Sequence, residues 1–142
     1  MNSDSVKTLP GGLAVDDRGR VCFVNDFDFS DVKRFYQVEN HEVGYIRAWH
    51  AHKKEGKYVY VPKGAALVGA VSLDDQDNVQ KVVLAEEKPA VLWIPPNHAN
   101  GFQNLRPNTV LMFFSTSTLE ESQGDDIRYP YDNWNIWEKD YR

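Results

Sequence analysis

The sequence contains little cysteine, no long hydrophobic run and no long block of like charge, and each absence excludes a class of protein. Its single cysteine, Cys22, excludes an internal disulfide framework and a cysteine cluster for zinc, so we expect a cytoplasmic protein. No stretch approaches the roughly 18 apolar residues of a membrane span, and residues 1–10 hold no apolar run typical of a signal peptide. Because the 16 basic and 21 acidic residues are interspersed, with a net charge of -5, we expect no binding to nucleic acid or membranes.

The sequence does contain enough apolar surface for one core. The chain has 142 residues, of which 42% are hydrophobic and 13% aromatic, and this predicts a single domain. We expect one domain over residues 1–142, with a flexible start at 1–10 and a C-terminal tail at 118–142. The tail is rich in tyrosine and tryptophan, so we expect it to pack on the rest of the domain.

Short runs rich in Val, Tyr, Phe and Ile recur about every ten residues, separated by Gly, Pro, Asn and Asp. This pattern is typical of an all-β protein, and short strands that must hide their edges favour a jelly roll, with other small barrels left open. A capping-box pattern from Thr118 to Glu121 predicts one short helix. The expected strands cover residues 21–24, 32–38, 45–52, 58–62, 66–73, 79–84, 90–94, 101–105 and 110–115.

The segment 44–64 carries the most chemical information. Residues two apart in a strand share a face, so His50 and His52 are predicted to point one way and Arg47 and Trp49 the other. Two structural histidines would be the simplest explanation of a bare His-x-His pair.

Two motifs resemble those of the cupins. Gly44, the two histidines and Gly64 fit the spacing of the first cupin motif, but Lys57 stands at the position of its Glu. Residues 95–104 resemble the second motif, with Asn100 in place of its His. The resemblance implies a cupin jelly-roll barrel. Because an ammonium and an amide replace two of the four metal ligands, we expect no metal and no other cofactor.

Further short segments of the sequence resemble two groups of cupins that act on nucleotide-linked 4-keto-6-deoxyhexoses. Residues 17–19, 33–36, 47–54 and 126–132 are similar to sugar 3,4-ketoisomerases. A second set of residues is similar to the matching positions of dTDP-4-dehydrorhamnose 3,5-epimerases. It comprises Arg47 with His50, the single residue Lys57, and residues 93–96 with 101–102. The resemblance implies a nucleoside-diphosphate sugar as substrate. It also implies a role in making sugars for cell-surface polysaccharide, such as the O-antigen of lipopolysaccharide.

Both groups remove a proton beside the C4 ketone of the sugar and stabilise the resulting enolate. By resemblance, His50 is the base. Lys57 would lower the pKa of His50 by like-charge repulsion and would face the enolate oxygen. A solvated loop charge is the simpler alternative for Lys57.

A nucleoside diphosphate requires cationic partners. We predict Arg47 as the main diphosphate ligand, because a guanidinium binds phosphate with two parallel hydrogen bonds. Each of the other basic side chains could instead simply keep the surface soluble. The further predicted substrate-binding residues are Arg18, Arg34, His52, Lys54 and Asn100.

The proton donor departs from the pattern of both groups. The 3,5-epimerases use a late-strand tyrosine, where this sequence has Phe113, and the ketoisomerase pattern is broken at Gln37. We therefore expect Tyr129 or Tyr131 to supply the acid, unless both simply cover the end of the barrel.

Together these features predict a metal-independent isomerase, namely a nucleotide-sugar epimerase that acts at C3, with C5 as a further position. Lys57 favours the epimerase, because the ketoisomerases tend to have an amide there. The alternatives are a sugar 3,4-ketoisomerase on the same substrate class and a noncatalytic sugar-binding cupin. Aromatic side chains expected on the surface predict a homodimer.

Overall fold

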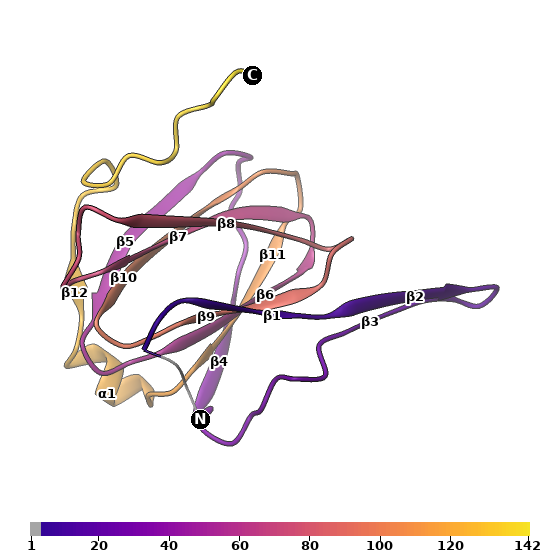
Figure 1. Ribbon diagram of the computed structural model, residues 1–142, viewed down its shortest axis with the longest axis horizontal. Coiled ribbons are helices and arrows are strands. Elements are labelled where there is room, and N and C mark those ends of the chain that lie inside the picture. The colour runs from indigo at the N-terminus through magenta and orange to yellow at the C-terminus, as the bar shows by residue number, and fades with distance from the viewer. Residues whose placement is uncertain (1–3) are drawn as a thin grey trace.

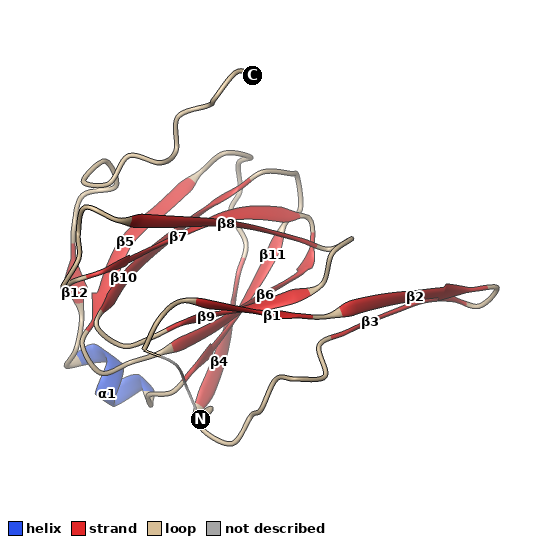
Figure 2. Cartoon of the chain, viewed as in Figure 1, coloured by secondary structure: helices blue, strands red, loops and turns tan. Residues whose placement is uncertain are grey.

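The computed structural model describes residues 4–142, and two five-stranded antiparallel sheets pack against each other (Figure 1). In sheet order, the first contains β1 (Lys7–Pro10), β9 (Ala90–Ile94), β6 (Lys57–Lys63), β11 (Val110–Ser115) and β4 (Arg34–Val38). The second contains β12 (Ile127–Arg128), β5 (Ile46–His52), β10 (His98–Asn104), β7 (Ala65–Ser72) and β8 (Val79–Ala85). Strands dominate the chain (Figure 2), and the predicted jelly-roll fold is confirmed.

The main core lies between the two sheets. Val59 and Val61 from β6, and Val68 and Ala70 from β7, are at most 2% exposed. In each strand the two residues are two apart, so strand alternation directs both to the same face. Burying one such aliphatic side chain stabilises the folded state by about 1.5–3 kcal/mol. The two sheets are therefore held together by apolar side chains from the short hydrophobic runs that are visible in the sequence.

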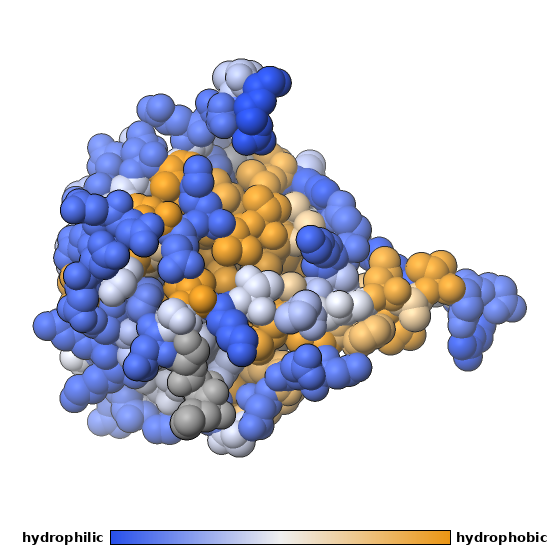
Figure 3. Space-filling model, in the orientation of Figure 1, coloured by the Kyte–Doolittle hydropathy of each residue, from blue (hydrophilic) through white to orange (hydrophobic). Residues whose placement is uncertain are grey.

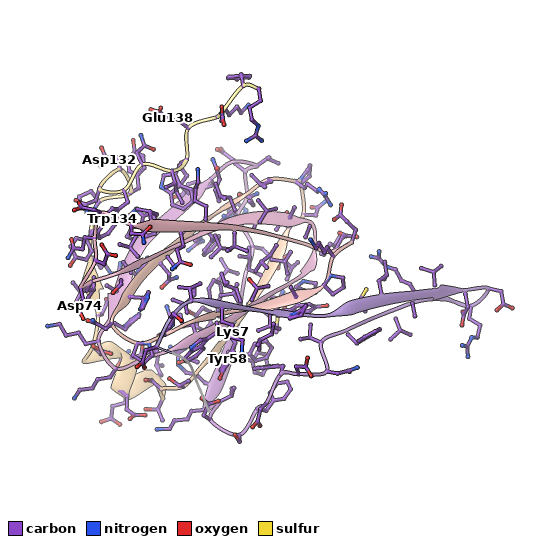
Figure 4. The ribbon with its side chains drawn as sticks, in the orientation of Figure 1. Lys7, Tyr58, Asp74, Asp132, Trp134 and Glu138 are labelled. Atoms are coloured by element: carbon purple, nitrogen blue, oxygen red, sulfur yellow. The ribbon has the colours of Figure 1, made fainter. Side chains whose placement is uncertain are left out.

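The C-terminal tail covers the outer face of the second sheet. The rings of Trp134 and Trp137 each lie 5.3 Å from that of Trp49 on β5. Nε1 of Trp134, labelled in Figure 4, donates to the carbonyl of Gln76 in the β7–β8 loop. These tryptophans bury apolar surface on a sheet face that would otherwise be open to water.

One helix, α1 (Leu119–Gln123), connects β11 to the tail and begins where the capping box predicts. Oγ1 of Thr118 accepts a hydrogen bond from the backbone N–H of Glu121 at 3.2 Å, and the Glu121 carboxylate accepts one from the backbone N–H of Thr118 at 2.9 Å. Within residues 4–142, no helix is both long and apolar enough to cross a membrane.

A separate hairpin, β2 (Gly12–Asp16) with β3 (Gly19–Phe23), projects away from the two sheets (Figure 1). Of the expected flexible start, residues 1–3 lie outside the described part. Residues 7–10 instead form β1, whose residues pair with β9 from Lys7 opposite Trp93 to Pro10 opposite Ala90. The expectation of a flexible segment was therefore wrong for residues 7–10. Backbone pairing holds this exposed strand, and an alternating apolar pattern does not reveal it.

Candidate active site

A cavity of about 180 Å³ lies inside the barrel between the two sheets. It continues into a wider space of about 220 Å³ beside α1 and β12. Tyr36, His50 and Lys57 line both spaces, so we treat the two as one site. Arg47 and Asn100 line the inner space. The site thus contains an imidazole, an ammonium, a phenol and an amide.

Arg47 lines the inner cavity together with His50, although a regular strand would place it on the opposite face. The pairing of β5 with β10 explains the difference. His50 lies opposite Asn100, but Arg47 lies opposite Phe102. Between these pairs β5 has one more residue than β10, and this β-bulge returns Arg47 to the inner face. The predicted orientation of Arg47 was therefore wrong, whereas its predicted place in the site is retained.

Gly101 on β10 makes room for this bulge. A Cβ at Gly101 would lie 2.4 Å from the Cβ of Ala48 and 3.1 Å from the carbonyl oxygen of Arg47. The Arg47 side chain then donates from Nε to Oδ1 of Asn40 at 2.6 Å. This hydrogen bond fixes the guanidinium at the edge of the cavity.

His50 is half-buried, and its environment favours the neutral imidazole. Burial is the main cause that lowers its pKa from the ordinary value of 6.5, and the positive charges of Arg128 and Lys57 lower it further. The carboxylate of Asp126 partly offsets this. The expected lowering by Lys57 is confirmed in direction, but burial is the larger cause. His50 can therefore accept a proton at neutral pH.

A buried glutamate that no sequence motif marks lies in the β5–β6 loop. Oε2 of Glu55 lies 3.4 Å from Nε2 of His52 and 3.5 Å from Nζ of Lys57. Its Oε1 lies 3.5 Å from Nη2 of Arg34. Burial alone would raise the pKa of Glu55, but Lys57 and His52 lower it below its ordinary value. The ionised carboxylate is thus surrounded by three side chains of the cavity wall.

Both ring nitrogens of His52 face partners within the protein. Nδ1 lies 2.5 Å from the carbonyl oxygen of Asp125, while Nε2 faces Glu55. The Asp125 carboxylate accepts hydrogen bonds from the backbone N–H groups of Lys53, Lys54 and Glu55 at 2.9, 2.8 and 3.1 Å. Burial raises the pKa of Asp125, but these N–H groups lower it below its ordinary value. The arrangement favours an anchoring role for His52 over direct contact with a sugar.

Two residues that were predicted to bind the substrate lie apart from this cavity. Lys54 is exposed, and its backbone is held by Asp125. The side chain of Arg18 is 85% exposed in the turn of the β2–β3 hairpin, where Nη2 pairs with Oδ2 of Asp16 at 2.5 Å. Neither side chain lines the inner or the wider space. Of the predicted cationic ligands, Arg47 and Arg34 line the site.

Tyr129 and Tyr131 lie on the outer face of the second sheet, so the expectation that they supply the acid was wrong. The backbone of Tyr129 pairs with Trp49, and its ring lies 5.0 Å from that of Trp134. The carbonyl of Tyr131 accepts a hydrogen bond from Nε1 of Trp49 at 3.0 Å, and 54% of this tyrosine is exposed. Trp49 and His50 are adjacent in β5 and point to opposite faces. Neither tyrosine lines the cavity.

The phenol that lines the cavity belongs to Tyr36 on β4. Its ring stacks on Phe113 of β11, with centroids 5.0 Å apart and an interplanar angle of 7°. Tyr36 belongs to the first sheet and His50 to the second. The phenol and the imidazole therefore approach the cavity from opposite sheets. In the sequence, Tyr36 is marked only as part of the segment 33–36, which resembles the ketoisomerases.

The side chains of the site are poorly suited to bind a metal ion. Within residues 4–142, no group of three or more His, Cys, Asp or Glu side chains is placed to hold one. Lys57 and Asn100, which replace two cupin ligands, both line the inner cavity. Activity without a metal stays a prediction.

The jelly-roll barrel, with ionisable side chains lining a cavity between its sheets, belongs to the cupin-like fold class. The chain belongs to the dTDP-4-dehydrorhamnose 3,5-epimerase family, whose model matches residues 14–139. It is therefore an enzyme of the isomerase class, and the family suspected from the sequence motifs is confirmed.

Known proteins of two activities are similar to this chain. The spore coat polysaccharide biosynthesis protein SpsL of Bacillus subtilis (strain 168) is 28% identical over 150 residues, which cover 98% of this chain and 99% of SpsL. The QdtA 3,4-ketoisomerase of Thermoanaerobacterium thermosaccharolyticum, a double mutant in complex with TDP, matches with a TM-score of 0.71 and 20% identity, covering 93% and 91% of the two chains.

ChmJ, a 3'-monoepimerase from Streptomyces bikiniensis in complex with dTDP-quinovose, matches with a TM-score of 0.75 and 16% identity over 87% of this chain and 68% of ChmJ. At these identities the two solved structures establish a shared fold. They do not decide between epimerase and ketoisomerase.

Proposed function

We propose that this protein is a nucleotide-sugar epimerase that inverts C3 of a nucleoside-diphosphate-linked 4-keto-6-deoxyhexose. One observation carries the proposal: an imidazole with a lowered pKa and a phenol line one cavity from opposite sheets, and a lysine lines the same cavity. Inversion requires a base on one face of the sugar and an acid on the other. A nucleotide sugar is the substrate class that the family membership supports.

His50 removes the C3 proton in this reaction. Burial and nearby positive charge lower its pKa, so the imidazole is neutral before the reaction. Once His50 has taken the proton, the negative charge of Asp126 stabilises the imidazolium. The ammonium of Lys57 lines the same cavity and stabilises the oxyanion that develops at O4.

Tyr36 returns a proton from the opposite face and completes the inversion. It replaces the tail tyrosines in that role, because it lines the cavity and they do not. A phenol is a suitable donor, since it carries its proton at neutral pH and its ring can lie along an apolar wall. Phe113 provides that wall by stacking on the Tyr36 ring.

The cationic side chains bind the diphosphate. Arg47 lines the inner cavity, and Arg34 and Arg128 line the wider space, so guanidinium groups stand at both parts of the site. The buried amide of Asn100 is placed to bind a sugar hydroxyl. SpsL is named for spore coat polysaccharide biosynthesis, and we propose that the product of this enzyme also serves the synthesis of a cell-surface polysaccharide.

The similarity to QdtA supports a second candidate, a 3,4-ketoisomerase. The two reactions share the proton removal at C3 but differ in where the proton returns. In deuterated water an epimerase places deuterium at an inverted C3, whereas a ketoisomerase places it at C4 of a 3-keto sugar. A noncatalytic sugar-binding cupin would exchange nothing. A panel of nucleotide-linked 4-keto-6-deoxy sugars, starting with the dTDP series, separates the three by NMR.

We further propose that the chain forms a homodimer through the β2–β3 hairpin. Val15 and Val21 of this hairpin are 72% and 63% exposed. Figure 3 shows apolar surface along the hairpin up to its hydrophilic turn. A groove lined by Cys22, Phe23 and Phe29 continues this surface. An apolar surface of this kind on a small domain usually meets another protein surface, and a second copy is the commonest partner.

We expect light scattering at micromolar concentration to give twice the chain mass of 16.3 kDa. Replacing both Val15 and Val21 with Glu should give the monomer mass, because charge on an apolar contact opposes association. Val83→Glu is the matched control, since Val83 is 58% exposed but belongs to β8 of the second sheet and not to the hairpin. A monomeric wild type would contradict the proposal.

A further inference from the structure

We propose that Glu55 is a positioning residue of the active site, which holds the ammonium of Lys57 at the cavity wall and supplies its counter-charge. Oε2 of Glu55 lies 3.5 Å from Nζ of Lys57, and Lys57 lines both parts of the cavity. The inference rests on the proposed function, in which Lys57 stabilises the enolate. Glu55 itself does not line the cavity, so it acts through Lys57.

Stability alone gives a poor account of this glutamate. The Glu55 side chain has no exposed surface. Burying an ionised carboxylate is costly, and apolar side chains of similar size often stabilise a protein at least as well as a buried ion pair does. A carboxylate kept at such a position is better explained by the charges that it orders, and these belong to the proposed site.

The loop that carries Glu55 is clamped from both sides. Asp125 accepts hydrogen bonds from three successive backbone N–H groups that end at Glu55. The next residue, Gly56, donates to Oγ1 of Thr116 at 2.9 Å, and a Cβ at Gly56 would lie 2.2 Å from the ring of Trp93. The carboxylate therefore has a fixed position before any substrate binds.

Lys57 needs such an anchor. Its side chain has four rotatable bonds, and the neighbouring cavity wall carries the positive charge of Arg34 and the imidazole of His52. Glu55 contacts all three groups at 3.4 to 3.5 Å. With the carboxylate in place, the ammonium is held at the site where enolate charge develops, so less reorganisation is required during the reaction.

The test is a double-mutant cycle with Glu55→Gln and Lys57→Met. Glu55→Gln keeps the shape and removes the charge, and we expect kcat to fall about 10-fold or more while KM changes less than about 3-fold, because Lys57 acts after binding. In the Lys57→Met background the same change should alter kcat less than about 2-fold. Glu120→Gln removes an equal charge from an exposed position on α1 and should leave kcat unchanged.

Three results would overturn the proposal: wild-type kcat in Glu55→Gln, an effect on KM alone, or the same loss of kcat in both backgrounds. If Glu55→Gln does not fold, Glu55→Asp replaces it, since this variant keeps the charge but withdraws it from Lys57. Its kcat should be several-fold below wild type at unchanged KM. A wild-type kcat in Glu55→Asp would then contradict the proposal.

Thermal unfolding separates this inference from the proposed reaction, because it needs no substrate. It is measured on the four proteins of the cycle: the wild type, Glu55→Gln, Lys57→Met and the double variant. Coupled effects on Tm, together with a wild type that exchanges no sugar proton, would mean that the reaction is wrong while the pairing of Glu55 with Lys57 holds. Additive effects on Tm would overturn the pairing, whatever the reaction is.

Discussion

Replacing His50 with asparagine is expected to lower kcat about 100-fold or more, the usual contribution of a positioned acid or base. Nucleotide affinity should change little, because the basic side chains that bind the diphosphate stay in place. Asparagine is polar and somewhat smaller, so the half-buried position remains filled. Turnover assays with titration of the bare nucleotide measure both quantities.

The same histidine fixes the acid limb of the pH profile. A base is active when neutral, so kcat/KM is high above the pKa of His50 and falls as the pH drops below it. Burial, Arg128 and Lys57 lower this pKa. The midpoint of the acid limb should therefore lie below the ordinary value of 6.5. A midpoint above that value would contradict the assignment of His50.

His98→Asn is the matched control for His50→Asn. His98 is buried, its Nδ1 lies 2.9 Å from the carbonyl oxygen of Pro96, and its side chain does not line the cavity. We expect this variant to keep near-normal kcat. If His50→Asn kept the normal rate instead, the assignment of His50 as the base would be wrong.

Replacing Tyr36 with phenylalanine should abolish inversion but not proton exchange. Without the phenol, the enolate formed by His50 is reprotonated from the same face, so the substrate picks up solvent deuterium at C3 and keeps its configuration. We expect product formation to fall about 100-fold or more, with exchange reduced far less. NMR of the sugar in deuterated water follows inversion and exchange in one sample.

Tyr129→Phe and Tyr131→Phe are the controls for this experiment. Both remove the same hydroxyl from the outer face of the second sheet, behind the wall that carries His50. Normal inversion by both, with loss in Tyr36→Phe, would support the assignment of the acid. Loss of inversion in a tail variant alone would return the role to the tail.

Most of the barrel could be predicted from the sequence, because its strands are short apolar runs separated by turn-forming residues. β9 and β11 begin and end where the pattern predicts. β1 and β2 could not be predicted in this way, since backbone pairing holds β1 in place and β2 projects with largely exposed side chains. The hydrophobic pattern of a single segment predicts a strand whose side chains are buried. It does not predict a strand that is held mainly by backbone pairing.

The sequence predicted those site residues whose positions a motif defines. It did not predict those whose positions depend on three-dimensional packing. His50, Lys57 and Asn100 were found by their spacing, and the structure brings all three to one cavity. Glu55 carries only a weak signal, a glutamate two residues before Lys57, because its contacts depend on how the loop folds back. Arg47 was assigned to the wrong face, because one extra residue in a strand reverses the alternation.

The most direct test of the account is deuterium incorporation by the wild-type protein from a dTDP-linked 4-keto-6-deoxyhexose in deuterated water. NMR of the recovered sugar should show one deuterium at C3 with inverted configuration, and the His50→Asn variant should show neither inversion nor deuterium. Deuterium at C4 of a 3-keto product would contradict the proposed epimerase and establish the ketoisomerase. Binding of the sugar without any exchange by the wild type would contradict catalysis at this site altogether.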